Sequence, residues 1–261
     1  MVNKKCVVVI PLYRKLQPIE LSFVENGLRK TEGFEKVLIA PEQLIIDESY
    51  GNLTKLRIER FPNHFFQNIE GYNRLMISPD FYKRFADFEY LLIHQSDVYL
   101  FKNELDYWCN QSYDYIGAPW YKTSVLKKRS LRCWLYRNFW QPLLARKRKN
   151  GWLANKVGNG GLSLRNVSAA IKTLELCKAE LYKAYWNPSS HNYNEDVFWS
   201  IEAPKINRKF RIPHWEEALK FALEYEPENA VRQMRGELPF GCHAPLIIDA
   251  NFWKKHIPEM N

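Results

Sequence analysis

The sequence predicts one α/β domain with a mixed, mostly parallel central sheet flanked by helices. Residues 5–12 and 36–41 are short apolar runs with a helical pattern between them, which is the order of a parallel strand–helix–strand unit. A further apolar run at 90–93 follows another helical segment. With 261 residues the chain can bury a full core, so we expect a single domain over 1–261.

The first helix is expected to begin near Pro18 and Glu20 and to end at Gly33. Proline and an acidic residue favour the first turn of a helix, and glycine favours its end. Residues 56–62 (LRIERFP) then predict a third strand.

A helical segment from Gly71, interrupted at Pro79, leads into the strand that ends near Asp97. Residues 162–166 (LSLRN) predict another strand, and a helix is expected from 168 to about 184. The crossover order places Asp97 at the carboxyl end of a sheet strand.

The five cysteines form no CxxC pair and no zinc spacing, and their odd number argues against a complete disulfide framework. About six apolar residues precede Pro11, too few for a signal peptide or a membrane span. These features favour a cytoplasmic protein.

The basic charge of the chain is concentrated in one segment. Between Asp114 and Glu175 there are thirteen Lys or Arg and no acidic residue, and without those thirteen the net charge of +9 becomes −4. Residues at about 121–155 therefore predict a basic amphipathic helical insert. For 122–149 we favour contact with an anionic membrane surface, at about 1 kcal/mol per cation. A solvated hairpin is the alternative, and nucleic-acid binding is not expected because no known module is present.

Asp97 ends the apolar strand that contains 90–93. A carboxylate at the end of a buried strand is costly unless it holds a cation or a hydrogen-bond partner. Ligands of open α/β sheets bind at such ends. Asp97 is thus a candidate metal ligand, and a loop-capping aspartate is the alternative.

Three further features of the sequence are candidates for a functional role. Glu195 and Asp196 lie at a predicted helix N-terminus, where the helix dipole favours ionised acids, and are either site carboxylates or first-turn acids. The glycines around Gly160 allow close approach of a ligand or a tight turn, but the sequence of a phosphate loop is absent. His243 is either structural or a partner of Asp97 on an ion such as Mn²⁺.

Seven short motifs occur in order along the chain: VVVIPLY, GYNRL, LLIHQSDVYL, IGAPW, GNGGLSLR, NEDVFW and PFGCHA. Together they resemble the nucleotide-sugar glycosyltransferases of the GT-A fold, which is Rossmann-like. The closest resemblance is to a bacterial family of glycosyltransferase-like proteins described as a domain of unknown function (family 5672). It spans the chain from Lys5 to Ala244 except for the basic insert.

In GT-A enzymes, an Asp-x-Asp motif at a strand end binds a divalent metal that bridges the two donor phosphates and stabilises the leaving diphosphate. Here Asp97-Val98-Tyr99 keeps only the first acid. The resemblance implies that His243 supplies the second ligand to Mn²⁺ or Mg²⁺.

The resemblance also implies that Asp196 is the general base that takes the acceptor's proton, with Glu195 as the second choice. Trp120 and Trp199 are expected either to stack on acceptor sugars or to belong to the core. The residues implied in donor binding, besides Asp97, are Pro11, Leu12, Tyr13, Asn73, Arg74, Gln95, Gly160 and Gly161.

The predicted function is transfer of a sugar from a nucleotide-sugar donor, with a UDP-sugar favoured, to a glycan or lipid-linked glycan hydroxyl. We expect inversion, metal dependence and a role in bacterial surface polysaccharide synthesis, either in the cytoplasm or on the inner face of its membrane. A catalytically silent, membrane-peripheral binding protein is the alternative. A sugar nucleotidyltransferase is less favoured because a glycine-rich activation loop does not follow the first strand.

Overall fold

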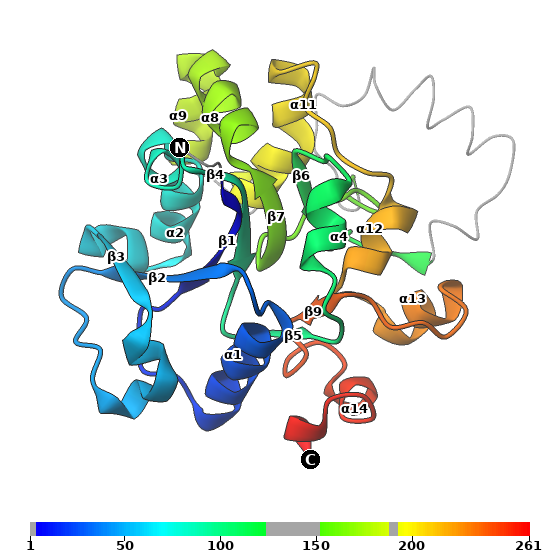
Figure 1. The fold of residues 1–261 in the computed structure, drawn as a ribbon. Coiled ribbons are helices and arrows are strands. Elements are labelled where there is room, and N and C mark those ends of the chain that lie inside the picture. The colour runs from blue at the N-terminus through cyan, green and yellow to red at the C-terminus, as the bar shows by residue number, and fades with distance from the viewer. Residues whose placement is uncertain (1–3, 124–151, 188–192) are drawn as a thin grey trace, which may run out of the picture.

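The computed structural model describes residues 4–123, 152–187 and 193–261. The α/β prediction is confirmed: a six-stranded sheet has the order β3-β2-β1-β4-β7-β6 and is flanked by helices (Figure 1). Strand β7 is antiparallel to both of its neighbours, β4 and β6, and the pairs among β1, β2, β3 and β4 are parallel. The strands are β1 (Lys4–Pro11), β2 (Glu35–Pro41), β3 (Arg57–Phe61), β4 (Phe88–His94), β6 (Tyr115–Gly117) and β7 (Leu162–Asn166).

The central strands β1, β2 and β4 are nearly continuous apolar sequences because helices cover both faces of the sheet. Val9 of β1 pairs with Val37 on one side and Ile93 on the other. All three side chains are fully buried. This register brings the carboxyl ends of β1 and β4 to the same edge of the sheet.

A second, three-stranded sheet has the order β5-β9-β8 and lies beside the carboxyl end of β4 (Figure 1). It consists of β5 (Val98–Leu100), β8 (Ala222–Leu223) and β9 (Gly241–His243). In the antiparallel pair β5–β9, Val98 faces His243. The small sheet therefore joins the turn after β4 to a segment nearly 150 residues further along the chain.

The helices pack on these sheets in separate groups. Helix α1 packs on β5, α8 packs on β4 and α3, α9 packs on α2, and α12 contacts β6 and β8. The α-helices are α1 (Pro18–Lys30), α2 (Ile69–Met76), α3 (Pro79–Lys83), α4 (Leu105–Asn110), α8 (Val167–Leu176), α9 (Ala179–Trp186), α10 (Glu195–Val197), α11 (Ala203–Ile206), α12 (Trp215–Phe221), α13 (Pro227–Gln233) and α14 (Ala250–Trp253). Short 3₁₀ turns are η1 (Glu48–Lys55), η2 (Asn63–Phe66) and η6 (Pro258–Met260), and η5 (Phe198–Glu202) is a π-helical turn.

Two helices differ from the sequence prediction. The helix expected from 168 to about 184 is divided into α8 and α9, because its two halves pack on different partners, α3 and α2. The helix that begins at Glu195 changes to the π turn η5 before α11. Pro204, in the first turn of α11, has no N–H to donate to the preceding turn, which accounts for the irregularity there.

No helix in the described part of the chain is long and apolar enough to cross a membrane. Most of the basic insert predicted at about 121–155 falls within 124–151, outside the described residues. The contact of 122–149 with an anionic membrane stays a prediction. The assignment of residues 1–261 to a single domain also stays a prediction.

Candidate active site

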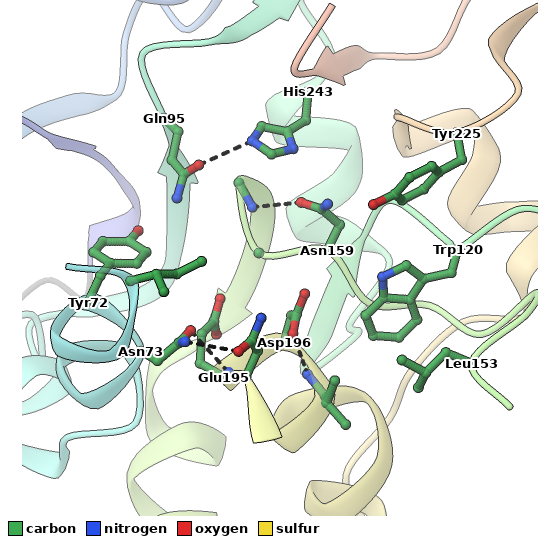
Figure 2. A pocket seen from close by; sticks show the side chains of 15 residues that line it. Tyr72, Asn73, Gln95, Trp120, Leu153, Asn159, Glu195, Asp196, Tyr225 and His243 are labelled. Carbon is green, nitrogen blue, oxygen red and sulfur yellow. Dashed lines mark hydrogen bonds between the residues drawn. The ribbon is translucent and has the colours of Figure 1, made fainter. Parts of the chain in front are cut away.

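A cavity of about 410 Å³ lies where β4 and β9 end and β7 begins. Figure 2 shows Gln95 and His243 at one end, Glu195 and Asp196 at the opposite end, and Asn159 between them. The antiparallel strands β4 and β7 are neighbours here, so polar side chains from distant segments of the chain come together. This is the edge of the sheet at which the sequence placed a ligand site.

Asp97 and His243 come together at the first end. Asp97 lies in the turn between β4 and β5, and the Ala244 N–H donates to the Asp97 carbonyl at 3.0 Å, which fixes the two segments. His243 Nε2 is 3.3 Å from Asp97 Oδ1 and 3.1 Å from Gln95 Oε1. Asp97 itself contacts His243 from outside the cavity lining, whereas His243 and Gln95 line it.

The charges at this end stabilise one another. Burial alone would lower the pKa of His243, but hydrogen bonding and charge from Asp97 and Glu224 outweigh it and raise the pKa to about 10. Burial would likewise raise the pKa of Asp97, yet the His243 contact holds it below its ordinary value. Asp97 is thus kept ionised at neutral pH.

Tyr99, which occupies the position of the second acid of Asp-x-Asp, points away from this end. Its ring packs edge-on against Phe23 and Phe101, with centroids 5.4 and 5.2 Å apart, and it is 8 % exposed. In an alternating strand, Tyr99 faces the side opposite to its neighbours. His243, from the paired strand β9, therefore lies beside Asp97 instead of the second acid.

Glu195 and Asp196 form the opposite end, at the start of α10. The Glu195 N–H donates to Asn73 Oδ1 at 3.2 Å, and its carboxylate lies 3.0 Å from Arg165 Nη2. Both side chains of this ion pair are buried. Arg165 also donates to the Tyr82 hydroxyl at 2.9 Å and to Ser163 Oγ at 3.1 Å, so its charge is fully satisfied.

Asp196 has a different environment from its neighbour. Its Oδ1 accepts the Val197 N–H at 2.7 Å, and among the described residues no Lys, Arg or His forms an ion pair with it. Burial, followed by the charge of Glu195, raises the pKa of Asp196 to about 7. Its carboxyl points into the cavity toward Asn159 (Figure 2). A carboxyl with such a pKa exchanges protons near neutral pH.

Gly160 and Gly161 lie between the two ends of the cavity, and each packs against a side chain of one end. A Cβ at Gly160 would lie 1.8 Å from Glu195 Oε1, and a Cβ at Gly161 would lie 2.2 Å from His243 Nε2. No other residue type leaves room for these side chains. The glycines are therefore required by the protein's own packing at both ends of the cavity.

Most residues predicted for the site line this cavity: Asn73, Gln95, Trp120, Gly160, Gly161, Glu195, Asp196 and His243. Others do not. Arg74 donates from Nε to the Trp186 carbonyl at 2.7 Å, at the end of α9. Pro11 ends β1, Leu12 is fully buried, and Tyr13 is 48 % exposed in the following loop.

Of the two alternatives for Trp199, acceptor stacking or the core, its burial favours the core. The indole is 1 % exposed, donates to the Met76 carbonyl at 3.2 Å and packs among Tyr82, Phe198 and Phe210. A ring enclosed in this way has no face for a sugar. Trp120, by contrast, lines the cavity together with Leu153 and Tyr225 (Figure 2).

Sequence reasoning missed three groups of this site. Arg165 lies within the buried strand LSLRN, and a charge in such a strand is itself a signal that a buried partner exists. Asn159 and Glu224 carry no comparable signal, since each lies in a polar loop. Glu224 reaches His243 only through the pairing of β8 with β9.

Among the described residues, no group of three or more His, Cys, Asp or Glu is arranged to hold a metal. Two protein ligands remain: Asp97 Oδ1 and His243 Nε2 lie 3.3 Å apart, with Gln95 Oε1 beside them. Mg²⁺ and related ions are commonly held by one or two protein groups and substrate phosphates. These residues fit a divalent ion only as a pair of ligands, so further ligands would have to come from outside the described residues.

A family model matches residues 55–243, which include every residue lining the cavity. The chain belongs to this family. It is described as "Protein of unknown function (DUF5672)". No curated protein matches the chain.

Among solved structures, the DUF5672 chain is similar to one titled "crystal structure of a glycosyltransferase involved in the glycosylation of the major capsid of PBCV-1". The two share 12 % identity and a TM-score of 0.47, over 97 % of this chain and 98 % of the other.

Proposed function

We propose that this DUF5672 chain is a glycosyltransferase of the GT-A type. It moves a sugar from a nucleotide-sugar donor, a UDP-sugar by preference, to a hydroxyl of a glycan or lipid-linked glycan in bacterial surface polysaccharide synthesis. The observation that carries the proposal is the division of one cavity into two chemically distinct ends. One end presents a histidine beside an ionised aspartate, and the other presents an aspartate with a pKa of about 7.

The first end suits the donor diphosphate. Asp97 and His243 would hold Mn²⁺ or Mg²⁺, which when bound stabilises the negative charge of the departing nucleoside diphosphate. Gln95, which lines the cavity beside His243, can contact the donor. The glycine turn at 160–161 allows the donor sugar to lie close to the backbone between the two ends.

Asp196 suits the role of general base. Its carboxylate would accept the proton of the acceptor hydroxyl while that oxygen bonds to the anomeric carbon of the donor sugar. The bond from this carbon to the diphosphate oxygen breaks, and its electron pair leaves with the nucleoside diphosphate. Attack from the side opposite to the leaving group inverts the anomeric configuration.

Glu195 is less suited to the reaction than Asp196. Its carboxylate is buried, 4 % exposed for the residue as a whole, and is already paired with Arg165. We assign Glu195 to positioning: with Asn73 it fixes the start of α10, and its charge helps to keep the pKa of Asp196 near 7.

The test is a screen of nucleotide sugars with Mn²⁺, followed by Asp196→Asn. Loss of general base catalysis is expected to slow sugar transfer, or donor hydrolysis by water, by about 10²- to 10⁴-fold, with donor affinity retained. Asp80→Asn is the matched control, because its side chain is 88 % exposed.

Transfer at the wild-type rate by Asp196→Asn would remove Asp196 from the role of base. A wild-type chain that binds a nucleotide sugar but consumes none with any acceptor would be a binding protein rather than an enzyme.

A further inference from the structure

Glu224 lies directly after β8 and is 6 % exposed. In the parallel pair β8–β9, Leu223 pairs with Cys242, so the next residues on the two strands, Glu224 and His243, lie side by side. A buried carboxylate requires compensation. The nearby cation among the described residues is the His243 imidazole, whose Nδ1 is 3.6 Å from Glu224 Oε2.

The two nitrogens of the His243 ring face different surroundings. Nδ1 faces Glu224, whereas Nε2 faces Asp97 at 3.3 Å and Gln95 at 3.1 Å. At 3.6 Å the Glu224 contact is an ion pair, and a shift of a few tenths of an ångström would make it a hydrogen bond.

Glu224 is itself held in place by the glycine turn. Asn159 Nδ2 donates to Glu224 Oε2, and Asn159 Oδ1 accepts the Gly161 N–H at 3.0 Å. Gly161 in turn lies directly against the His243 ring. These four residues close a ring of contacts that joins the loop before β7, the end of β8 and the end of β9.

Such a contact has a defined consequence for a metal-ligating histidine. When one ring N–H is held by a carboxylate, the tautomer and ring orientation are fixed and the other nitrogen becomes a better ligand. We propose that Glu224 is a positioning residue that holds the Nδ1–H of His243, so that Nε2 faces the divalent ion beside Asp97. This inference rests on the proposed function, since it requires the Asp97–His243 metal site.

The test uses Mn²⁺ as the probe, added to the full-length protein with and without UDP, with the free ion followed by electron paramagnetic resonance. Removal of an outer carboxylate typically weakens metal binding about 10- to 100-fold, and this loss is expected for Glu224→Ala. Glu224→Gln keeps an oxygen acceptor in an isosteric side chain and is expected to lose less. Glu226→Gln, two residues further on and hydrogen-bonded to Thr123, is the matched control with unchanged affinity.

A second readout follows the His243 ring itself. In the Mg²⁺-loaded protein, the Nδ1–H proton of His243 is expected to resonate downfield and to exchange slowly with water in the wild type, because the Glu224 carboxylate accepts it, and to lose both properties in Glu224→Ala. A merely structural role would leave this resonance unchanged.

The outcomes separate the two proposals. Wild-type Mn²⁺ affinity and an unchanged Nδ1–H resonance in both folded Glu224 variants would overturn the role of Glu224 and leave the metal site intact. Failure of the wild type to bind Mn²⁺, with or without UDP, would overturn the metal site and the role of Glu224 with it. Neither result would bear on Asp196, which is tested by transfer.

Discussion

The two ends of the cavity contain the same kinds of carboxylate but compensate them in opposite ways. At one end a single imidazole lies between Asp97 and Glu224, and the pKa of Asp97 is held below its ordinary value. At the other, Arg165 pairs with Glu195 and leaves Asp196 with a pKa of about 7. Groups whose surroundings separate their pKa values in this way are suited to different roles. In the proposed function, the position of the nearest cation thus separates the proposed metal ligand, Asp97, from the proposed base, Asp196.

The largest effect is expected from removing the cation at the Asp196 end. Arg165→Met leaves Glu195 buried without its partner, which should lower the free energy of unfolding by about 3–5 kcal/mol. Urea unfolding measures it. Arg232→Met is the control, because its pair with Glu228 is exposed and such pairs contribute about 1 kcal/mol or less.

The double variant Arg165→Met with Glu195→Leu sharpens this result. Replacing a whole buried ion pair by apolar side chains is often neutral, so most of the lost stability should return. If Arg165→Met were as stable as the wild type, compensation of Glu195 would not depend on Arg165, and the contrast between the two ends would fail.

The next effect concerns the pH dependence of stability. The pKa of Asp196 is about 7 in the folded protein, against an ordinary value of 3.8. Well below pH 3.8 the group is protonated in both states and has no effect. As pH rises toward 7 the unfolded chain ionises first, so the wild type loses stability, up to at most about 4 kcal/mol above pH 7.

Asp196→Asn should therefore be more stable than the wild type at pH 8 by a much larger margin than at pH 4, as measured by unfolding at both values. Ionisation of Asp196 should also govern activity, so the kcat/KM of the wild type should rise through pH 7. An equal difference in stability at the two pH values would show that the pKa of Asp196 is not raised.

The difference between the two ends also explains what could be predicted from the sequence. Asp97 is detectable because it follows closely after an apolar strand, and Asp196 because it lies in the first turn of a helix, and both signals are local. The partner that defines each end is not local. Glu224 meets His243 through a strand of two residues, too short to leave a pattern in the sequence.

The central sheet was predictable for the same reason. Its strands β1, β2 and β4 are nearly continuous apolar sequences, since both faces of the sheet are covered. Aromatic residues were harder to assign: the sequence left sugar stacking and the core open for both Trp120 and Trp199, yet one lines the cavity and the other is enclosed in the core. That distinction depends on packing, which one residue's neighbours in sequence do not determine.

The smallest effect on stability, and the most specific effect on the site, is expected from alanine substitutions at the two neighbouring glycines. The added methyl group of Gly160→Ala meets Glu195, and that of Gly161→Ala meets His243. Each should cost about 1–3 kcal/mol by overpacking. Gly161→Ala should weaken Mn²⁺ binding and leave the pH midpoint of activity near 7, whereas Gly160→Ala should shift that midpoint and leave Mn²⁺ affinity unchanged.

Each glycine variant is the control for the other, because adjacent positions carry the same substitution. If both variants changed both properties equally, a displacement at one end would be transmitted to the other through the turn at 160–161. The ligand end and the base end would then be a single mechanical unit, and their opposite electrostatics would be two results of one packing arrangement.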